Sequence, residues 1–226
     1  MKYTNILKLL LLSQLFLTPA QGYADVEGGL FDSALPSYDS GDIYVFSNRR
    51  VEWLKSVEND HIVWTTRSGK EFIRDRNFVI PILKWRAGKR KGQRRIYGNP
   101  DHLWPLKIGN DARFRVVTEK TSLKNENSKR SVQHWQCEVK GYDALTIKAG
   151  TFSSYSIVCD RYSPTSMTLL QRKTWHYAPS LGHYIKHETQ NYFTGKKESF
   201  ELAVTLSGRQ ANVRRLKQIL SNLDKN

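Results

Sequence analysis

The stretch that decides the fold is residues 42–73, which reads DIYVFSNRRVEWLKSVENDHIVWTTRSGKEFI. It contains four short runs rich in β-branched and aromatic residues, at 43–46, 51–57, 61–66 and 71–73. Turn-forming residues separate these runs, and short strands with turns at such close spacing predict an antiparallel meander.

Alternation within these runs predicts which side of the sheet is buried. Ile62 and Trp64 flank Val63, and Val51 and Trp53 flank Glu52. Because side chains alternate between the two faces of a strand, this pattern favours a sheet with one buried and one wet face.

Strand character continues through most of the remaining chain. Further strands are expected at 112–121, 132–140, 145–148, 151–161, 168–177, 184–192 and 200–205. Residues 75–111 carry Pro81, Pro100, Pro105 and a dense basic run, so we expect a long excursion there rather than central strands.

The chain is expected to end in one amphipathic helix over 208–223. Val213, Leu216, Leu220 and Leu223 recur at helical spacing, and Ser207 with Gln210 has the spacing of a capping box. The predicted fold class is therefore all-β, with a curved antiparallel sheet or open barrel and a core-covering C-terminal helix. The alternative for the helix is a membrane-surface segment.

The N-terminus has the layout of a secretory signal peptide over 1–24. Lys2 and Lys8 precede a nine-residue apolar run, 9–17, and Gly22 and Ala24 place small residues before a cleavage site at Asp25. We therefore expect a periplasmic protein, or alternatively a secreted one. Residues 25–41 are acidic and aperiodic and are interpreted as a loosely attached leader before a single domain at 42–226.

The charge balance points to an anionic partner. Lys and Arg number 36 against 21 Asp and Glu, a net charge of +15, and removal of the two lysines of 1–24 leaves +13. For an exported protein the available anions are lipid head groups and acidic polysaccharides rather than nucleic acid. Peripheral membrane contact is compatible with this charge, and the sequence does not define the oligomeric state.

Cys137 and Cys159 are the two cysteines of the chain. An even count in an oxidising compartment favours a disulfide between them, the alternative being two small buried hydrophobic residues.

Three segments carry a resemblance to a poorly characterised group of exported Gram-negative proteins. Residues 101–114 read DHLWPLKIGNDARF, 148–152 read KAGTF before a strand and a Cys, and 174–184 read TWHYAPSLGHY. The group pairs an AGTF segment with a W-x-Y-A-P-x-L-G-x-Y segment. The resemblance implies an exported all-β domain and brings no catalytic residues with it.

The strongest candidate binding site is a basic cluster flanked by aromatic residues, and Gly88 and Gly92 are expected to keep it flexible. Cations beside aromatic faces suit anionic groups on sugar or lipid surfaces, the alternative being a solvated loop. The candidate ligand-binding residues are Lys84, Trp85, Arg86, Lys89, Arg90, Lys91, Arg94, Arg95 and Tyr97.

Other chemistry finds less support in the sequence. His134, His176, His183 and His187 could supply three imidazoles to zinc, but their spacing matches no metal motif, and we expect no metal or cofactor. No nucleophile or nucleotide-binding motif occurs, so no catalytic residue is assigned. The leading prediction is a non-enzymatic binding or accessory protein of the cell envelope. The alternatives are an envelope hydrolase acting on glycan or peptide and a structural subunit of an envelope assembly.

Overall fold

The computed structural model describes residues 33–58, 61–124 and 127–223. The predicted signal peptide, 1–24, and residues 25–32 of the predicted leader lie outside the described residues.

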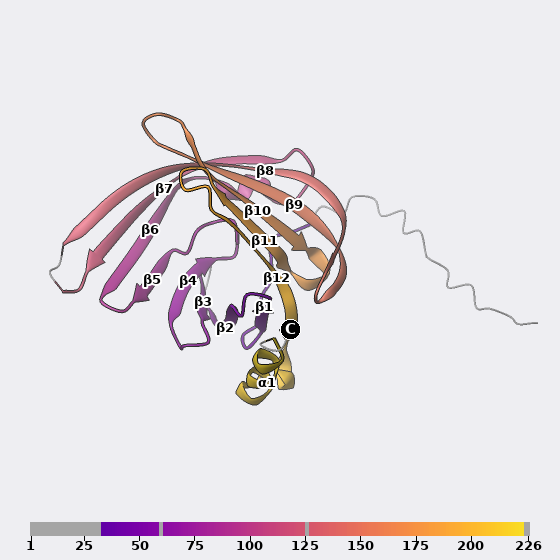
Figure 1. Cartoon of the computed structure of the whole chain (residues 1–226). Coiled ribbons are helices and arrows are strands. Elements are labelled where there is room, and N and C mark those ends of the chain that lie inside the picture. The colour runs from indigo at the N-terminus through magenta and orange to yellow at the C-terminus, as the bar shows by residue number, and fades with distance from the viewer. Residues whose placement is uncertain (1–32, 59–60, 125–126, 224–226) are drawn as a thin grey trace, which may run out of the picture. The chain divides into compact units, whose positions relative to one another are not determined.

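Twelve strands in the described part of the chain form one antiparallel sheet that closes into a barrel (Figure 1). The first six are β1 (Ile43–Phe46), β2 (Val51–Glu58), β3 (His61–Thr65), β4 (Glu71–Asp75), β5 (Lys84–Ala87) and β6 (Arg90–Gly98). The last six are β7 (Asp111–Ser122), β8 (Ser128–Ile147), β9 (Gly150–Tyr162), β10 (Leu169–Ala178), β11 (His183–Asn191) and β12 (Lys197–Leu206). Short 3₁₀ helices are η1 (Pro100–Leu103), η2 (Pro179–Leu181) and η3 (Gly208–Gln210), and the single α-helix is α1 (Val213–Leu223).

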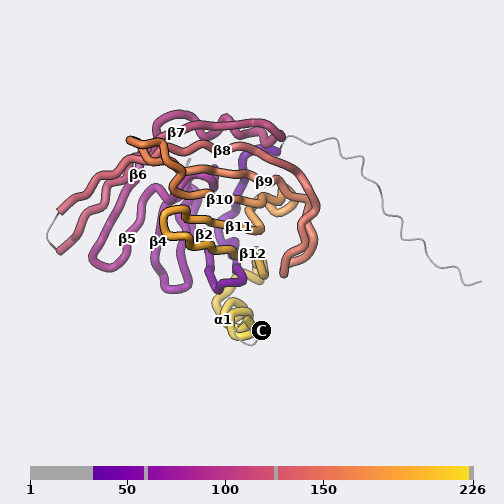
Figure 2. Tube along the Cα trace, turned by 45° about the horizontal axis from the view of Figure 1, so that its top comes forward, coloured from indigo at the N-terminus to yellow at the C-terminus, as the bar shows by residue number. Residues whose placement is uncertain are grey.

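The topology is a simple up-and-down meander. Each strand pairs with its neighbour in sequence, and β1 also pairs with β12 to close the barrel. The Cα trace follows this order from β2 around to β12 (Figure 2). The prediction of an all-β fold with an antiparallel sheet and one C-terminal helix is confirmed, and the structure adds that the barrel is closed.

The prediction of a long excursion over 75–111 is wrong. β5 and β6 lie within that range, and all nine residues of β6 pair with β7. The prolines that suggested a loop fall outside both strands, so they remove no hydrogen bond from the ladders.

The hydrophobic core has two parts. The main cluster lies inside the barrel and includes Trp64, Phe114 and Trp135. A second cluster lies on the outer face of β1, β2 and β12, where α1 covers it (Figure 1).

This second cluster overturns the expectation of a wet face at the start of β2. Val51 packs beneath α1, and the neighbouring Glu52 points to the barrel interior and is fully buried. Side chains alternate as the sequence predicts, but both faces of β2 are covered at these positions.

Helix α1 begins at Val213, later than the predicted start at 208. The side-chain Oδ1 of Asn212 accepts a hydrogen bond from the Arg215 backbone N–H, so Asn212 caps this helix rather than Ser207. Leu216, Ile219 and Leu220 are its buried residues, whereas Val213 is 52% exposed. Among the described residues no helix is long and apolar enough to cross a membrane.

Residues 33–41, the described part of the predicted leader, are attached to the barrel. Ser33 forms a β-bridge with Leu106, and Tyr38 packs edge-on against Trp64 with ring centroids 5.3 Å apart. The backbone N–H of Gly41 donates to the Leu54 carbonyl at 2.9 Å. This segment is therefore part of the packed structure rather than a loose leader.

Candidate functional site: a basic groove on the outer face of the sheet

The predicted basic cluster lies on the β5–β6 hairpin rather than in a loop. Strand alternation divides its side chains between the two faces. Lys84, Arg86 and Lys91 point to the outer face, whereas Trp85 and Arg94 point to the core side and are half-buried. Lys89 lies in the connecting turn. The structure therefore brings only part of the predicted set together.

Gly92 has a packing role rather than the predicted flexible one. It is the cross-strand partner of Trp85, and the indole lies directly over it. A Cβ atom at Gly92 would lie 2.1 Å from Trp85 Cζ2, which no packed structure tolerates. Gly92 therefore lets the Trp85 ring lie flat on the hairpin.

Arg94 holds the other side of Trp85. Its guanidinium carbon lies 4.3 Å from the indole ring centroid, and Nη1 donates to the Ile82 carbonyl at 2.6 Å. Burial, together with the nearby charge of Arg74, lowers the pKa of Arg94 to about 10. Arg94 thus fixes the indole from the core side and is not available to a ligand on the outer face.

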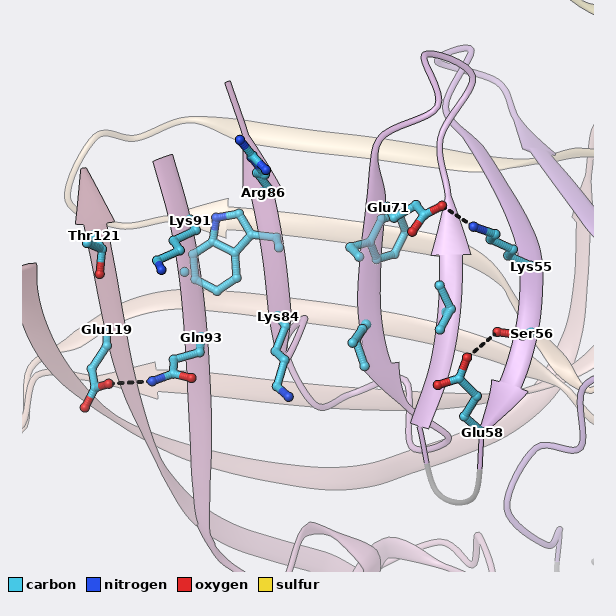
Figure 3. Close-up of a pocket in the computed structure, with 15 residues that line it drawn as sticks. Lys55, Ser56, Glu58, Glu71, Lys84, Arg86, Lys91, Gln93, Glu119 and Thr121 are labelled. Atoms are coloured by element: carbon cyan, nitrogen blue, oxygen red, sulfur yellow. Dashed lines mark hydrogen bonds and ion pairs between the residues drawn. The ribbon is translucent and has the colours of Figure 1, made fainter. Parts of the chain in front are cut away.

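A groove of about 670 Å³ runs across the outer face over β2 to β7 (Figure 3). The β4–β5 ladder at its centre is only two residue pairs long, and Phe72 and Trp85 of the first pair line the groove as well as the core. Val63 and Ile73 add aliphatic surface. The polar lining residues are Lys55, Ser56, Glu58, Glu71, Lys84, Arg86, Lys91, Gln93, Glu119 and Thr121.

Each carboxylate in the groove has a partner. Lys55 Nζ lies 2.5 Å from Glu71 Oε1, and Gln93 Nε2 donates to Glu119 Oε2 at 2.7 Å. Ser56 Oγ donates to Glu58 Oε1 at 3.0 Å. Figure 3 shows Lys84 and Arg86 between the Lys55–Glu71 pair and the Gln93–Glu119 pair.

The three central cations of the groove are not neutralised in this way. Within the described ranges Lys84, Arg86 and Lys91 make no ion pair, and Arg86 stands directly opposite Lys91 across the β5–β6 ladder. Like charges directly opposite each other on a sheet are destabilising. This arrangement therefore leaves positive charge at the groove that a bound anion would offset.

The remaining predicted residues lie elsewhere. Arg95 approaches Glu119 at 3.8 Å, and Tyr97 carries the guanidinium of Arg115 over its ring at 4.7 Å. Arg90 pairs with Ser122 at the start of β6. None of these three side chains, nor Lys89, lines the groove.

The predicted disulfide is confirmed. Cys137 and Cys159 are directly opposite each other on β8 and β9 and are bridged, with Cα atoms 4.0 Å apart. The bond lies in the core wall, away from the basic groove.

The sequence did not indicate a buried ion cluster inside the barrel. Glu52 Oε1 lies 2.5 Å from Arg50 Nη2 and 3.2 Å from Arg74 Nη2, and His183 Nε2 lies 3.5 Å from Glu52 Oε2. Tyr38 Oη and His183 Nδ1 are hydrogen-bonded at 3.0 Å. Burial alone would raise the pKa of Glu52, but the charges of Arg74 and Arg50 outweigh it and hold this pKa well below its usual range.

The four candidate metal-binding histidines are not brought together. His183 belongs to the Glu52 cluster, His187 packs on Trp175 at 3.9 Å, and His176 lies 3.6 Å from Glu188. His134 pairs with Arg115 across the β7–β8 ladder. In the part of the chain that the structure describes, no group of three or more potential ligands is placed to hold a metal ion.

Comparisons with known proteins give distant structural likenesses. No protein-family model matches the chain, and no curated protein matches it. Among solved structures, the hypothetical lipoprotein YmcC from Escherichia coli is similar at a TM-score of 0.48 and 9% identity, covering 72% of this chain and 82% of that one.

Two further structures give similar values. A Bacteroides fragilis protein, provisionally described as exported and with a YmcC-like fold, has a TM-score of 0.43 and 11% identity, over 77% of this chain and 100% of its own. A provisionally described lipoprotein from Parabacteroides distasonis has a TM-score of 0.43 and 14% identity, over 76% and 98%. Likenesses at this level carry no conclusion about this chain.

Proposed function

We propose that this is an exported, non-enzymatic binding or accessory protein of the cell envelope, located in the periplasm. Its proposed ligand is an anionic amphiphile, bound in the groove over β2 to β7. The N-terminal pattern of 1–24 supports export, and the excess of Lys and Arg supports an anionic partner.

One observation carries the choice of site. Lys84, Arg86 and Lys91 line the centre of a groove of about 670 Å³ whose lining also includes Val63 and Ile73. The cations suit a phosphate or carboxylate head group, and the aliphatic and aromatic floor suits the apolar part of the same molecule. An acidic polysaccharide would use the charge but not the floor, which is why we favour an amphiphile.

The size of the expected effect follows from the charge. Each Lys or Arg near an anionic membrane contributes about 1 kcal/mol, so three contribute about 3 kcal/mol, roughly a hundredfold in affinity. Exposed charges are screened as the Debye length falls from about 10 Å at 0.1 M salt to about 3 Å at 1 M. Binding should therefore weaken steeply with salt.

The test compares the wild type with K84Q/R86Q/K91Q by sedimentation with phosphatidylglycerol vesicles, phosphatidylcholine vesicles and purified alginate over a salt series. We expect the wild type to bind the phosphatidylglycerol vesicles, and the triple variant to lose most of that binding. Stronger binding to alginate than to vesicles would assign the groove to polysaccharide instead.

The matched control is R214Q/R215Q/K217Q, which removes three exposed cations from α1. It has the same net charge as the groove variant, so a general loss of positive charge would weaken both variants equally. Equal weakening, or salt-independent binding by the wild type, would refute the groove as the binding site.

A further inference from the structure

A second concentration of cations and aromatic rings lies on the opposite, core-facing side of the sheet. On β8 and β9, Trp135 and Arg161 are direct cross-strand partners. On β10, Lys173 pairs with Cys159 and Trp175 pairs with Ile157. Because Cys159 and Ile157 belong to the core, Lys173 and Trp175 face the barrel interior beside Arg161 and Trp135.

Lys173 lies against two indole rings. Its Nζ is 5.3 Å from the ring centroid of Trp135 and 5.9 Å from that of Trp175. The two rings are 4% and 5% exposed, whereas Lys173 as a whole residue is half-buried. The ammonium is thus held against the faces of two buried indole rings.

The barrel interior carries more positive charge than its carboxylate can balance. Glu52 forms ion pairs with both Arg50 and Arg74, so its single negative charge is shared between two cations. Within residues 33–58, 61–124 and 127–223, neither Arg94, Arg161 nor Lys173 makes an ion pair with a carboxylate. Unpaired charges are rarely retained in a protein interior.

The charges act on one another across the interior. Burial lowers the pKa of Lys173 to about 7, and the positive charges of Arg74, Arg94 and Arg161 act in the same direction. Burial also lowers the pKa of Arg161. The cations come from β4, β6, β9 and β10, so strands distant in sequence contribute to one positive region.

Several donors in this region have no acceptor. The Nε atom of Arg161 and the indole Nε1 atoms of Trp135 and Trp175 are buried and have no hydrogen-bond partner among the described residues. A buried donor without an acceptor destabilises the folded protein, so such groups on neighbouring strands need an explanation. All of these groups are donors, so the missing partner is an acceptor.

We propose that Lys173 and Arg161, flanked by Trp135 and Trp175, form an interior site for one oxyanion group, a phosphate or a carboxylate. An oxyanion accepts several hydrogen bonds and offsets the charge of both cations. The site lies on the opposite face of the sheet from the basic groove and is independent of the groove's proposed ligand. Inorganic phosphate serves as the probe for a phosphate group, and glucuronate serves as the probe for a carboxylate group.

The experiment measures the thermal midpoint and tryptophan fluorescence of the full chain during titration with inorganic phosphate, and separately with glucuronate, at constant ionic strength maintained with chloride. We expect a saturable rise in Tm with at least one anion, because a ligand that binds only the folded state stabilises it by mass action. Fluorescence should change with the same dissociation constant, since two indoles border the site. The anion that binds more tightly shows whether the site prefers a phosphate or a carboxylate group.

Three variants make the result specific. Lys173→Met keeps the length of the side chain without its charge and should weaken binding roughly ten- to hundredfold, whereas Lys173→Arg should retain it. K84Q/R86Q/K91Q should bind phosphate or glucuronate as the wild type does, which separates this site from the groove. The absence of a saturable response to both anions, or an unchanged response in Lys173→Met, would overturn the proposal.

Discussion

At the scale of single residues, the contact between Gly92 and Trp85 gives the sharpest prediction. Glycine is disfavoured in strands, so Gly92→Ala would ordinarily be neutral or stabilising on an exposed hairpin. Here the new methyl group meets the indole at 2.1 Å. We expect Gly92→Ala to destabilise the protein by about 1–3 kcal/mol, measured by urea unfolding.

The matched control for this change is a double-mutant cycle with Trp85→Ala. Without the indole the new methyl group has space, so Gly92→Ala in that background should cost close to nothing. An equal cost in both backgrounds would show that the backbone, and not Trp85, requires glycine at this position.

The lowered pKa of Lys173 predicts how the stability of the folded protein depends on pH. Its folded-state pKa of about 7 lies below the ordinary lysine value of 10.5. Between these values the unfolded chain binds more protons than the folded one, so stability rises with pH from about 7 upward and is flat below it. The charged groups that act on Lys173 are Arg50, Arg74, Arg94 and Arg161. His187 also faces Lys173 but stays neutral, because burial, followed by the charge of Lys173, lowers the pKa of His187 to about 2.

We therefore expect Lys173→Met to be more stable than the wild type at pH 7 in the absence of added anion. This difference in the free energy of unfolding should shrink as the pH rises to 9, because Lys173 loses its charge in the folded wild type. Arg94, whose pKa is about 10, stays charged over this range and does not confuse the comparison. Urea unfolding of both proteins at pH 6, 7, 8 and 9 measures the difference. A difference that stays constant over this range would contradict the lowered pKa.

At the scale of elements, α1 shows how a helix can change what a strand pattern means. Its buried residues cover Ile43, Val45 and Val51 on the outer face of the sheet. That cover buries the Val51 face of β2 outside the barrel, while the alternation places Glu52 in the barrel interior. Helix α1 is therefore part of the second hydrophobic cluster.

Leu216→Ala should therefore cost about 2–5 kcal/mol, since it removes a side chain that is 5% exposed between α1 and the sheet. Val213→Ala is the control, because Val213 is 52% exposed and its loss should change stability by less than about 0.5 kcal/mol. Denaturant unfolding measures both. If Leu216→Ala changes stability as little as Val213→Ala does, helix α1 is not part of the core.

Strand β6 marks where prediction from the sequence failed at this scale. Its sequence, RKGQRRIYG, contains one aliphatic residue and two glycines, so hydrophobic periodicity gives no strand signal. It is a strand because nine cross-strand pairs with β7 hold it. Tertiary pairing outweighs local propensity here, and the same pairing divides the predicted cations between two faces.

At the scale of the whole molecule, the local signals were sufficient for the fold class but not for the sites. Patterns such as Ile62–Val63–Trp64 predicted the meander, and Cys137 with Cys159 predicted the bridge. The groove, in contrast, depends on β2 and β7 lying on either side of β5, and the interior cluster joins Arg74 to Lys173. The groove follows from the pairing of successive strands in the meander, and the interior cluster follows from closure of the barrel; no local pattern encodes either.

The last prediction concerns how much of the chain the folded protein needs. Tyr38 packs on Trp64 and shares a hydrogen bond with His183, so residues 33–41 stabilise the barrel. We expect exported protein to begin at Asp25 by N-terminal sequencing, and a chain of residues 25–226 to be as stable as the full one. A chain of residues 42–226 should lose roughly 2–4 kcal/mol, from burial of the Tyr38 ring and one hydrogen bond. Tyr38→Phe, which removes only the hydroxyl, should lose about 1 kcal/mol. If residues 42–226 prove as stable as 25–226, the segment is a loose leader after all, and its contacts with the barrel contribute nothing to stability.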